Sequence, residues 1–296
     1  MNIKELYPAI LSAAHSISPI MDPEVETTST NAGIELREAW LLVSAPTFEP
    51  EPISAAILNI RAPYTSPTRY HKMLQGLAAK GMLNPKGEGK FFLTEVGAKT
   101  IRAVLKSAYN AIGGILPLSV IDLMDLASTL KEMTDLCMRA PEPPGKWCIE
   151  HTRKLDPGQT NPTMVRIDQF ISELVAYRDD AHLAAWNAYG ISGHAWNILT
   201  LLWSDGTLSI ETIQEKLEPR GFSVDETKEA LDQLSKKGWV LSSGMEVKIS
   251  PFGAEIRRIA EETTDRYYYA PFKAIPEKEI DKTIELLEKF RRGIPQ

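Results

Sequence analysis

The sequence has few cysteines, no long apolar run and no short motif of a common enzyme class. Only two cysteines occur among its 296 residues, Cys137 and Cys148, without CxxC spacing or paired histidines nearby. This pair argues against a disulfide framework and a structural zinc site, and it favours two ordinary thiols in a reducing compartment. We therefore expect a cytoplasmic protein with no metal site.

Membrane and export signals are also lacking. No apolar run reaches the roughly 18–20 residues that cross a bilayer. The opening stretch MNIKELYPAILSAAHSIS has no basic flank before an uninterrupted apolar core, so it is not an export signal. The sequence contains no GxSxG, no Walker loop and no GxGxxG that opens a helix after a strand. We expect no membrane partner and no cofactor, and catalysis by other residues stays open.

The composition is that of an ordinary folded protein, with 43% hydrophobic and 24% charged residues, enough apolar matter for two domains. The net charge of −6 argues against a protein that wraps nucleic acid over a wide surface, because such proteins are normally basic. The charge must therefore be examined segment by segment.

Residues 65–94, TSPTRYHKMLQGLAAKGMLNPKGEGKFFLT, have the layout of a winged helix. Ser66 can accept hydrogen bonds from the free N–H groups of a helix, and Pro67 fits the first helical position. One helix face is apolar, formed by Tyr70, Met73, Leu74 and Leu77. The opposite face, predicted to be exposed, carries Thr68, Arg69, His71, Lys72 and Gln75. Gly81 ends the helix, and a hairpin over residues 84–90 carries Lys86 and Lys90.

The same pattern returns later in the chain. KMLQGLAAKGML from Lys72 aligns with EALDQLSKKGWV from Glu229, and LTEVGAKTIR aligns with ISPFGAEIRR. The aligned pairs include core leucines and both glycines: Leu74 with Leu231, Leu77 with Leu234, Gly81 with Gly238, and Gly97 with Gly253. This repetition predicts an internal duplication, and two unrelated helical hairpins are the alternative.

We predict a mainly α fold with small β wings (α+β), in which two winged-helix domains related by internal duplication are joined and flanked by helices. The predicted domains are an N-terminal winged helix with a leading helix (1–112), a helical connecting region (113–189), a second winged helix (190–262) and a C-terminal helical extension (263–296). The leading helix covers residues 3–18 and a loop follows it. In the irregular segment 139–162, Trp147 and Ile149 pack against the body.

The last helix, from residue 277, carries an apolar stripe of Ile280, Ile284, Leu287 and Phe290. Such a stripe forms a homodimer contact or packs on its own chain.

The two copies differ in charge. Residues 33–106 contain ten lysines and arginines against six glutamates, whereas residues 190–262 contain eight basic against twelve acidic residues. Phosphate repels the acidic helix of the second copy. If one copy binds double-stranded DNA, we expect the first, with Thr68 on the contacting face, Arg69 and His71 toward the bases and Lys72, Lys86 and Lys90 toward phosphates. A solvated helix face without a partner is the alternative.

A second polar cluster lies in LVAYRDDAHLAAW, where Arg178, Asp179, Asp180 and His182 interrupt an apolar helix. A carboxylate near an imidazole fixes its tautomer and raises its basicity, which suits a ligand pocket. The same cluster suits a buried polar joint between helices. The sequence around His182 has no HxxxH or HxxE spacing, so it gives little support to a metal site.

These residues resemble the SalK-type helix-turn-helix family. Arg178, Asp180, His182 and the pair Ala184-Ala185 match its Arg-Gly-Asp-Gly-His-Val-Ala-Ala stretch, and the family's glycines are replaced at Asp179 and Ala181. Its later Thr-Asp and Ala-Pro-Trp elements correspond to Thr264-Asp265 and Ala270-Pro271-Phe272, with Phe in place of Trp. The resemblance is specific from about residue 165 onward. It implies a regulator with a shared site at Arg178, Asp180 and His182.

We therefore predict a transcriptional regulator of MarR-like fold that binds DNA through the first winged helix, responds to a small-molecule effector and forms a homodimer. A small-molecule-binding protein or enzyme with a central site of Arg178, Asp179, Asp180 and His182 is the alternative. A protein-interaction scaffold is a third.

Overall fold

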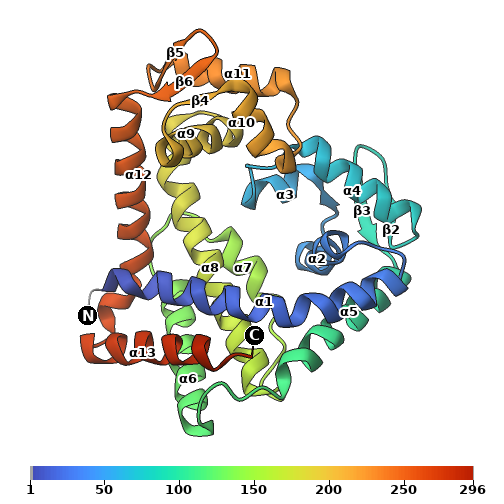
Figure 1. Cartoon of the computed structure of the whole chain (residues 1–296). Helices are drawn as coiled ribbons and strands as arrows, with labels where there is room; N and C mark the ends of the chain where they lie inside the picture. The colour runs from blue at the N-terminus through green and yellow to red at the C-terminus, as the bar shows by residue number, and fades with distance from the viewer. Residues whose placement is uncertain (1–2, 296) are drawn as a thin grey trace.

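The computed structural model describes residues 3–295 and is mainly helical, with two small antiparallel sheets (Figure 1). The mainly α fold with small β wings is thereby confirmed. Among the described residues, five α-helices lie outside the two sheet-bearing parts: α1 (Leu6–Asn31), α6 (Val120–Arg139), α7 (Trp147–Arg153), α8 (Thr163–Trp186) and α13 (Glu277–Gly293). The 3₁₀ turns are η1 (Ile3–Glu5), η2 (Ala45–Phe48), η3 (Asn187–Tyr189), η4 (Glu218–Arg220) and η5 (Pro271–Ala274).

Two parts of the chain have the same element order, and we call them the first and second modules. The first module, residues 36–113, comprises α2 (Leu36–Ser44), β1 (Ile53–Ser54), α3 (Ala55–Arg61), α4 (Pro67–Ala79), β2 (Leu83–Pro85), β3 (Lys90–Leu93) and α5 (Glu95–Gly113). The second, residues 193–269, comprises α9 (Gly193–Asp205), β4 (Leu208–Ser209), α10 (Ile210–Leu217), α11 (Val224–Lys236), β5 (Val240–Ser243), β6 (Glu246–Ile249) and α12 (Pro251–Tyr269). The sheet orders, β1-β3-β2 and β4-β6-β5, correspond.

The strand-to-helix corner is built alike in both modules. Thr94 donates to the carbonyl of Gly81 at 2.7 Å and accepts from the N–H of Gly97 at 3.0 Å. Ser250 donates to the carbonyl of Gly238 at 2.6 Å and accepts from the N–H of Gly253 at 2.9 Å. Gly81 and Gly238 have φ of 73° and 70°, a left-handed conformation that favours glycine.

The leading helix is longer than predicted. The expectation of a helix over 3–18 followed by a loop was wrong, because α1 continues through Pro19 and Pro23 to Asn31. Its buried positions keep helical spacing over the whole length: Leu6, Ile10, Ala13, Ile17, Met21 and Val25. This apolar face packs against α5, α8 and α13, and burial outweighs the backbone hydrogen bonds that the two prolines remove.

Helix α8 is the centre of the molecule, packed against α1, α5, α6, α7 and α12. The irregular segment before it contains the short helix α7, which buries Ile149 completely and Trp147 partly, as predicted. The apolar stripe of α13 is buried on α1 and α6 of the same chain, so the own-chain alternative describes this helix. The buried side chains form one contiguous core, and the four predicted domain limits stay a prediction.

The modules meet beside the N-terminus of α4, at the upper right of Figure 1. The N–H of Ser66 donates to the carbonyl of Arg220 at 2.9 Å, and a Cβ on Gly193 would lie 2.3 Å from the carbonyl oxygen of Pro63. The predicted cap by the Ser66 side chain was wrong, because this side chain makes no cap hydrogen bond and is buried at this junction. Pro67 occupies the first helical position, as predicted.

The close approach at the two corner glycines generates a stability prediction. A Cβ on Gly97 would lie 2.2 Å from the carbonyl oxygen of Met82, and one on Gly253 would lie 2.1 Å from that of Trp239. Gly97→Ala and Gly253→Ala should each lower the free energy of unfolding by about 1–3 kcal/mol, measured by urea denaturation. Gly114→Ala is the control, because no atom lies within 4 Å of its added Cβ. Unchanged stability in both corner variants would contradict the shared geometry.

Candidate functional site

Helix α4 presents one open polar stripe. Thr68, Lys72 and Gln75 are exposed and lie at the i, i+4 and i+7 positions of one helix face. The hairpin between β2 and β3 folds toward this stripe, since a Cβ on Gly89 would lie 3.4 Å from the His71 ring. Lys86 and Lys90 of this hairpin are exposed as well, and Lys90 also contacts Glu88 at 3.4 Å.

Two of the predicted DNA-contacting side chains are less open than expected. The aliphatic part of Arg69 covers Gly221 of the second module, where an added Cβ would lie 3.0 Å from the Arg69 Cβ. The His71 ring packs toward Phe91 of β3, with 6.0 Å between the ring centroids. The prediction that both side chains lie freely on the open face was wrong, because a neighbouring module and the hairpin cover them. Their contact with DNA stays untested.

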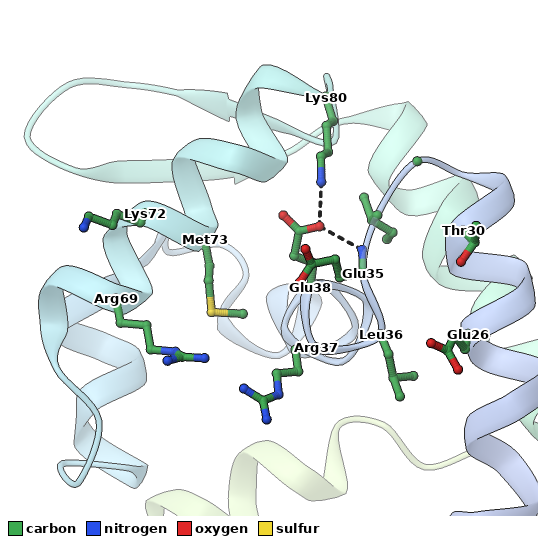
Figure 2. A pocket seen from close by; sticks show the side chains of 12 residues that line it. Glu26, Thr30, Glu35, Leu36, Arg37, Glu38, Arg69, Lys72, Met73 and Lys80 are labelled. Carbon is green, nitrogen blue, oxygen red and sulfur yellow. Dashed lines mark hydrogen bonds and ion pairs between the residues drawn. The ribbon is translucent and has the colours of Figure 1, made fainter. Parts of the chain in front are cut away.

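Arg69 also lines a cleft of about 890 Å³ between α1, α2 and α4 (Figure 2). Figure 2 shows Arg69 and Arg37 pointing into the cleft from α4 and α2, while Lys72 points away from it. Elsewhere in the cleft, Lys80 at the end of α4 donates to Glu38 of α2 at 2.6 Å, and Glu38 also accepts from the N–H of Glu35 at 2.9 Å. Neither guanidinium forms an ion pair with another residue between 3 and 295.

Arg37 is a candidate that the sequence analysis did not single out. It is exposed and shares the cleft with Arg69, so the two cations can attract an anionic group together. In the sequence it is one charge on a short amphipathic helix. Only the folded arrangement places it opposite α4.

The corresponding helix of the second module, α11, presents an acidic surface. Asp225, Glu229 and Asp232 are exposed, and the one lysine between them, Lys228, contacts Asp225 at 3.4 Å. Phosphate groups are repelled by such a face. The exposed side of α4 therefore carries a lysine, whereas the exposed side of α11 carries mainly carboxylates.

The predicted ligand cluster on α8 is divided among different neighbours. Arg178 donates to Asp265 of α12 at 2.8 Å and lies over the Tyr7 ring, 4.6 Å from its centroid. Asp179 faces the other way and pairs with Arg61 of α3, with an Oδ2–Nη2 distance of 3.0 Å. These two residues thus join α8 to two separate parts of the chain.

Asp180 is buried and caps helix α7. Its carboxylate accepts from the backbone N–H groups of Cys148 at 2.8 Å and Ile149 at 3.0 Å. These are free N–H groups at the N-terminus of a helix, where a carboxylate is favoured. Burial raises the pKa of Asp180 to about 6, and the hydrogen bonds from α7 oppose that rise.

His182 is held between α9 and α12. Its Nε2 accepts from the indole N–H of Trp196 at 3.2 Å, so its proton lies on Nδ1, 3.3 Å from the hydroxyl of Thr264. Burial lowers the pKa of His182 to about 4, and the nearby Glu261 carboxylate only partly offsets this effect. The imidazole is therefore neutral near pH 7.

The segments that resemble the SalK-type family contact one another. Arg178 pairs with Asp265 and His182 faces Thr264, while Phe272 of the following element is fully buried. These residues form a polar joint between α8 and α12. A ligand-binding role for Arg178, Asp179, Asp180 and His182 stays a prediction, and each of the four already has a protein partner.

Within residues 3–295, no group of three or more His, Cys, Asp or Glu side chains is arranged to hold a metal ion. Helices of the length and apolarity needed to cross a bilayer are also absent from that range.

The adjacent Asp179 and Asp180 allow a matched test of the joint. Asp180→Ala leaves two buried N–H groups without an acceptor and should lower the free energy of unfolding by about 2 kcal/mol or more. Asp179→Ala removes a half-exposed ion pair and should cost less than about 1 kcal/mol. Urea denaturation of both variants measures the difference. Equal losses would contradict the capping role of Asp180.

The buried His182 predicts a loss of stability in acid. Its folded-state pKa is below the usual 6.5, so its contribution is complete above pH 6.5 and is lost as the pH falls toward 4. His182→Gln, which keeps an acceptor for Trp196 but cannot be protonated, should show a shallower decline of the melting temperature over this range. His194, whose pKa burial also lowers to about 4, remains in both proteins. Identical pH profiles would contradict this assignment.

Comparison with known proteins gives one match. No curated protein and no solved structure matches the chain. A family model, described as a helix-turn-helix family, matches residues 164–296. The matched region begins with α8 and includes the whole second module and α13. In this region the chain is similar to a helix-turn-helix family.

Proposed function

We propose that the protein is a cytoplasmic DNA-binding transcriptional regulator that contacts double-stranded DNA through its first module. The observation that carries this proposal is the open basic surface of α4 and the β2–β3 hairpin. Thr68 and Lys72 lie on the open stripe of α4, and Lys86 and Lys90 lie on the hairpin beside it. A helix with an adjacent basic hairpin suits entry into a major groove, with lysines on the flanking phosphates.

The match to a helix-turn-helix family supports the same class of function, although it covers the acidic second module. We infer that the two modules arose by internal duplication, because their element order, sheet order and corner glycines agree. In this proposal the first module keeps a DNA-binding surface, and the second serves in assembly or regulation. The affiliations to SalK-type and MarR-like regulators, the homodimer and an effector belong to the same proposal.

Arg69 and His71 take supporting roles in this arrangement. The packing of Arg69 on Gly221 supports a role in orienting α4 relative to the second module. His71 lies between α4 and the hairpin and supports the position of the hairpin.

Binding of a labelled mixed-sequence duplex, followed by fluorescence anisotropy over a range of salt concentrations, tests the proposal. We expect the affinity to fall with salt, and Lys72→Ala, Lys86→Ala and Lys90→Ala each to weaken binding and reduce the slope of log affinity against log salt by about 1. Arg69→Ala should change the affinity less than any of these lysine variants.

Lys228→Ala is the matched control, because Lys228 lies on the corresponding helix of the second module. It should bind DNA like the unchanged protein. Absence of salt-dependent binding would overturn the proposal. A loss in Lys228→Ala as large as those in the first module would assign the contact to the second module instead.

A further inference from the structure

A cavity of about 360 Å³ lies between the first module and the central helix α8. Its wall is formed by side chains of α1, α2, α3, α5, α7 and α8 and by Leu155. This volume falls within the range of pockets that hold small organic molecules. The cavity is separate from the cleft beside Arg69 and from the polar joint at Arg178 and His182.

The wall of this cavity is mainly apolar and carries two aromatic rings, Trp40 from α2 and Tyr109 from α5. Its charged side chains are Arg61 and Asp168. The Arg61 guanidinium is already satisfied, because it donates to Asp179 at 3.1 Å and to Thr152 at 3.0 Å. The Asp168 carboxylate has no hydrogen-bond or ion-pair partner among residues 3–295.

An unpaired carboxylate on the wall of an apolar cavity is costly, because it gives up part of its hydration without gaining a counter-charge. Asp168 lies on α8, is half-buried and lines the same cavity as Trp40 and Tyr109. A ligand with one positive charge and an apolar body would supply both missing contacts. Aromatic faces also attract cations, which favours the same class of ligand.

A second cavity of about 190 Å³ shares four wall residues with the first, namely Ser44, Arg61, Thr152 and Leu155. It adds Leu58 of α3, Tyr70 of α4 and the ring of Trp147, which stacks on His151 with 3.9 Å between the centroids. The two cavities are therefore adjacent, and the second one extends from their shared wall toward α3 and α4.

We propose that the cavity between the first module and α8 binds a small organic cation, a protonated amine on a compact apolar body, with Asp168 as its counter-ion. The apolar body lies against Trp40 and Tyr109. Larger members of this ligand class extend past Arg61 toward Trp147.

The affinity depends on the ionisation of Asp168. Burial raises the pKa of this carboxyl group to about 6. Arg61 and Tyr109 are the other titratable side chains on the wall. Burial raises the pKa of Tyr109 above its usual value, so this phenol stays neutral between pH 5 and 8. Amine binding should therefore be strongest above pH 6 and weaken as the pH falls below it.

The test uses the full chain without DNA, so its outcome is independent of the proposed DNA binding. Phenethylamine, tryptamine and cyclohexylamine are titrated at pH 7.5 and followed by isothermal calorimetry and tryptophan fluorescence. Phenylpropionate supplies an anion of similar size, and ethylbenzene a neutral molecule. We expect saturable binding of at least one amine and at least tenfold weaker binding of both comparison molecules.

Asp168→Asn should weaken binding of that amine at least tenfold, whereas Asp232→Asn, an exposed carboxylate on α11, should leave it unchanged. A second variant, Ser172→Met, places a larger side chain on the cavity wall and should reduce binding of every probe. Circular dichroism establishes that each variant is folded. The proposal is overturned if none of the amines binds, if phenylpropionate binds as well as the amines, or if Asp168→Asn binds the amine unchanged.

Discussion

The buried and half-buried polar groups of α8 find partners inside the protein, and the arrangement of the other helices depends on how they do so. Arg178 pairs with α12, Asp179 with α3, Asp180 with the N-terminus of α7, and His182 with α9 and α12. An unsatisfied group at such a depth costs as much as several good contacts contribute. One short segment of α8 therefore orients both modules and the connecting region at once.

The two modules show how a shared core is compatible with different surfaces. The corner glycines are under tight steric limits, because an added Cβ would meet a backbone carbonyl within about 2 Å. Exposed helix positions carry no such limit, and their charges differ: Lys72 is exposed on α4, and Glu229 takes the aligned position on α11. The contact of Ser66 and Arg69 with the second module leaves Thr68 and Lys72 exposed on α4.

Much of this architecture is visible in the sequence because helical spacing, glycine stops and hairpin composition are local signals. The limits of α4 and the start of α13 follow from them closely. The errors arose where a distant contact overrides a local preference. Helix α1 passes through two prolines because three other helices cover its apolar face, and Ser66 does not cap α4 because a neighbouring module occupies its surroundings.

The sequence by itself determined the helical class, the recurring pattern of core leucines and glycine stops, and the unequal charge of the two segments that carry it, since each depends on the order and spacing of residues along the chain. Only the tertiary structure decided what the polar residues do. It divided Arg178, Asp179, Asp180 and His182 among separate partners, brought Arg37 opposite Arg69, and left Asp168 unpaired in a cavity. Hydrogen bonds and ion pairs act over a few ångströms in space, and residues far apart in sequence come within that distance only after the helices have packed.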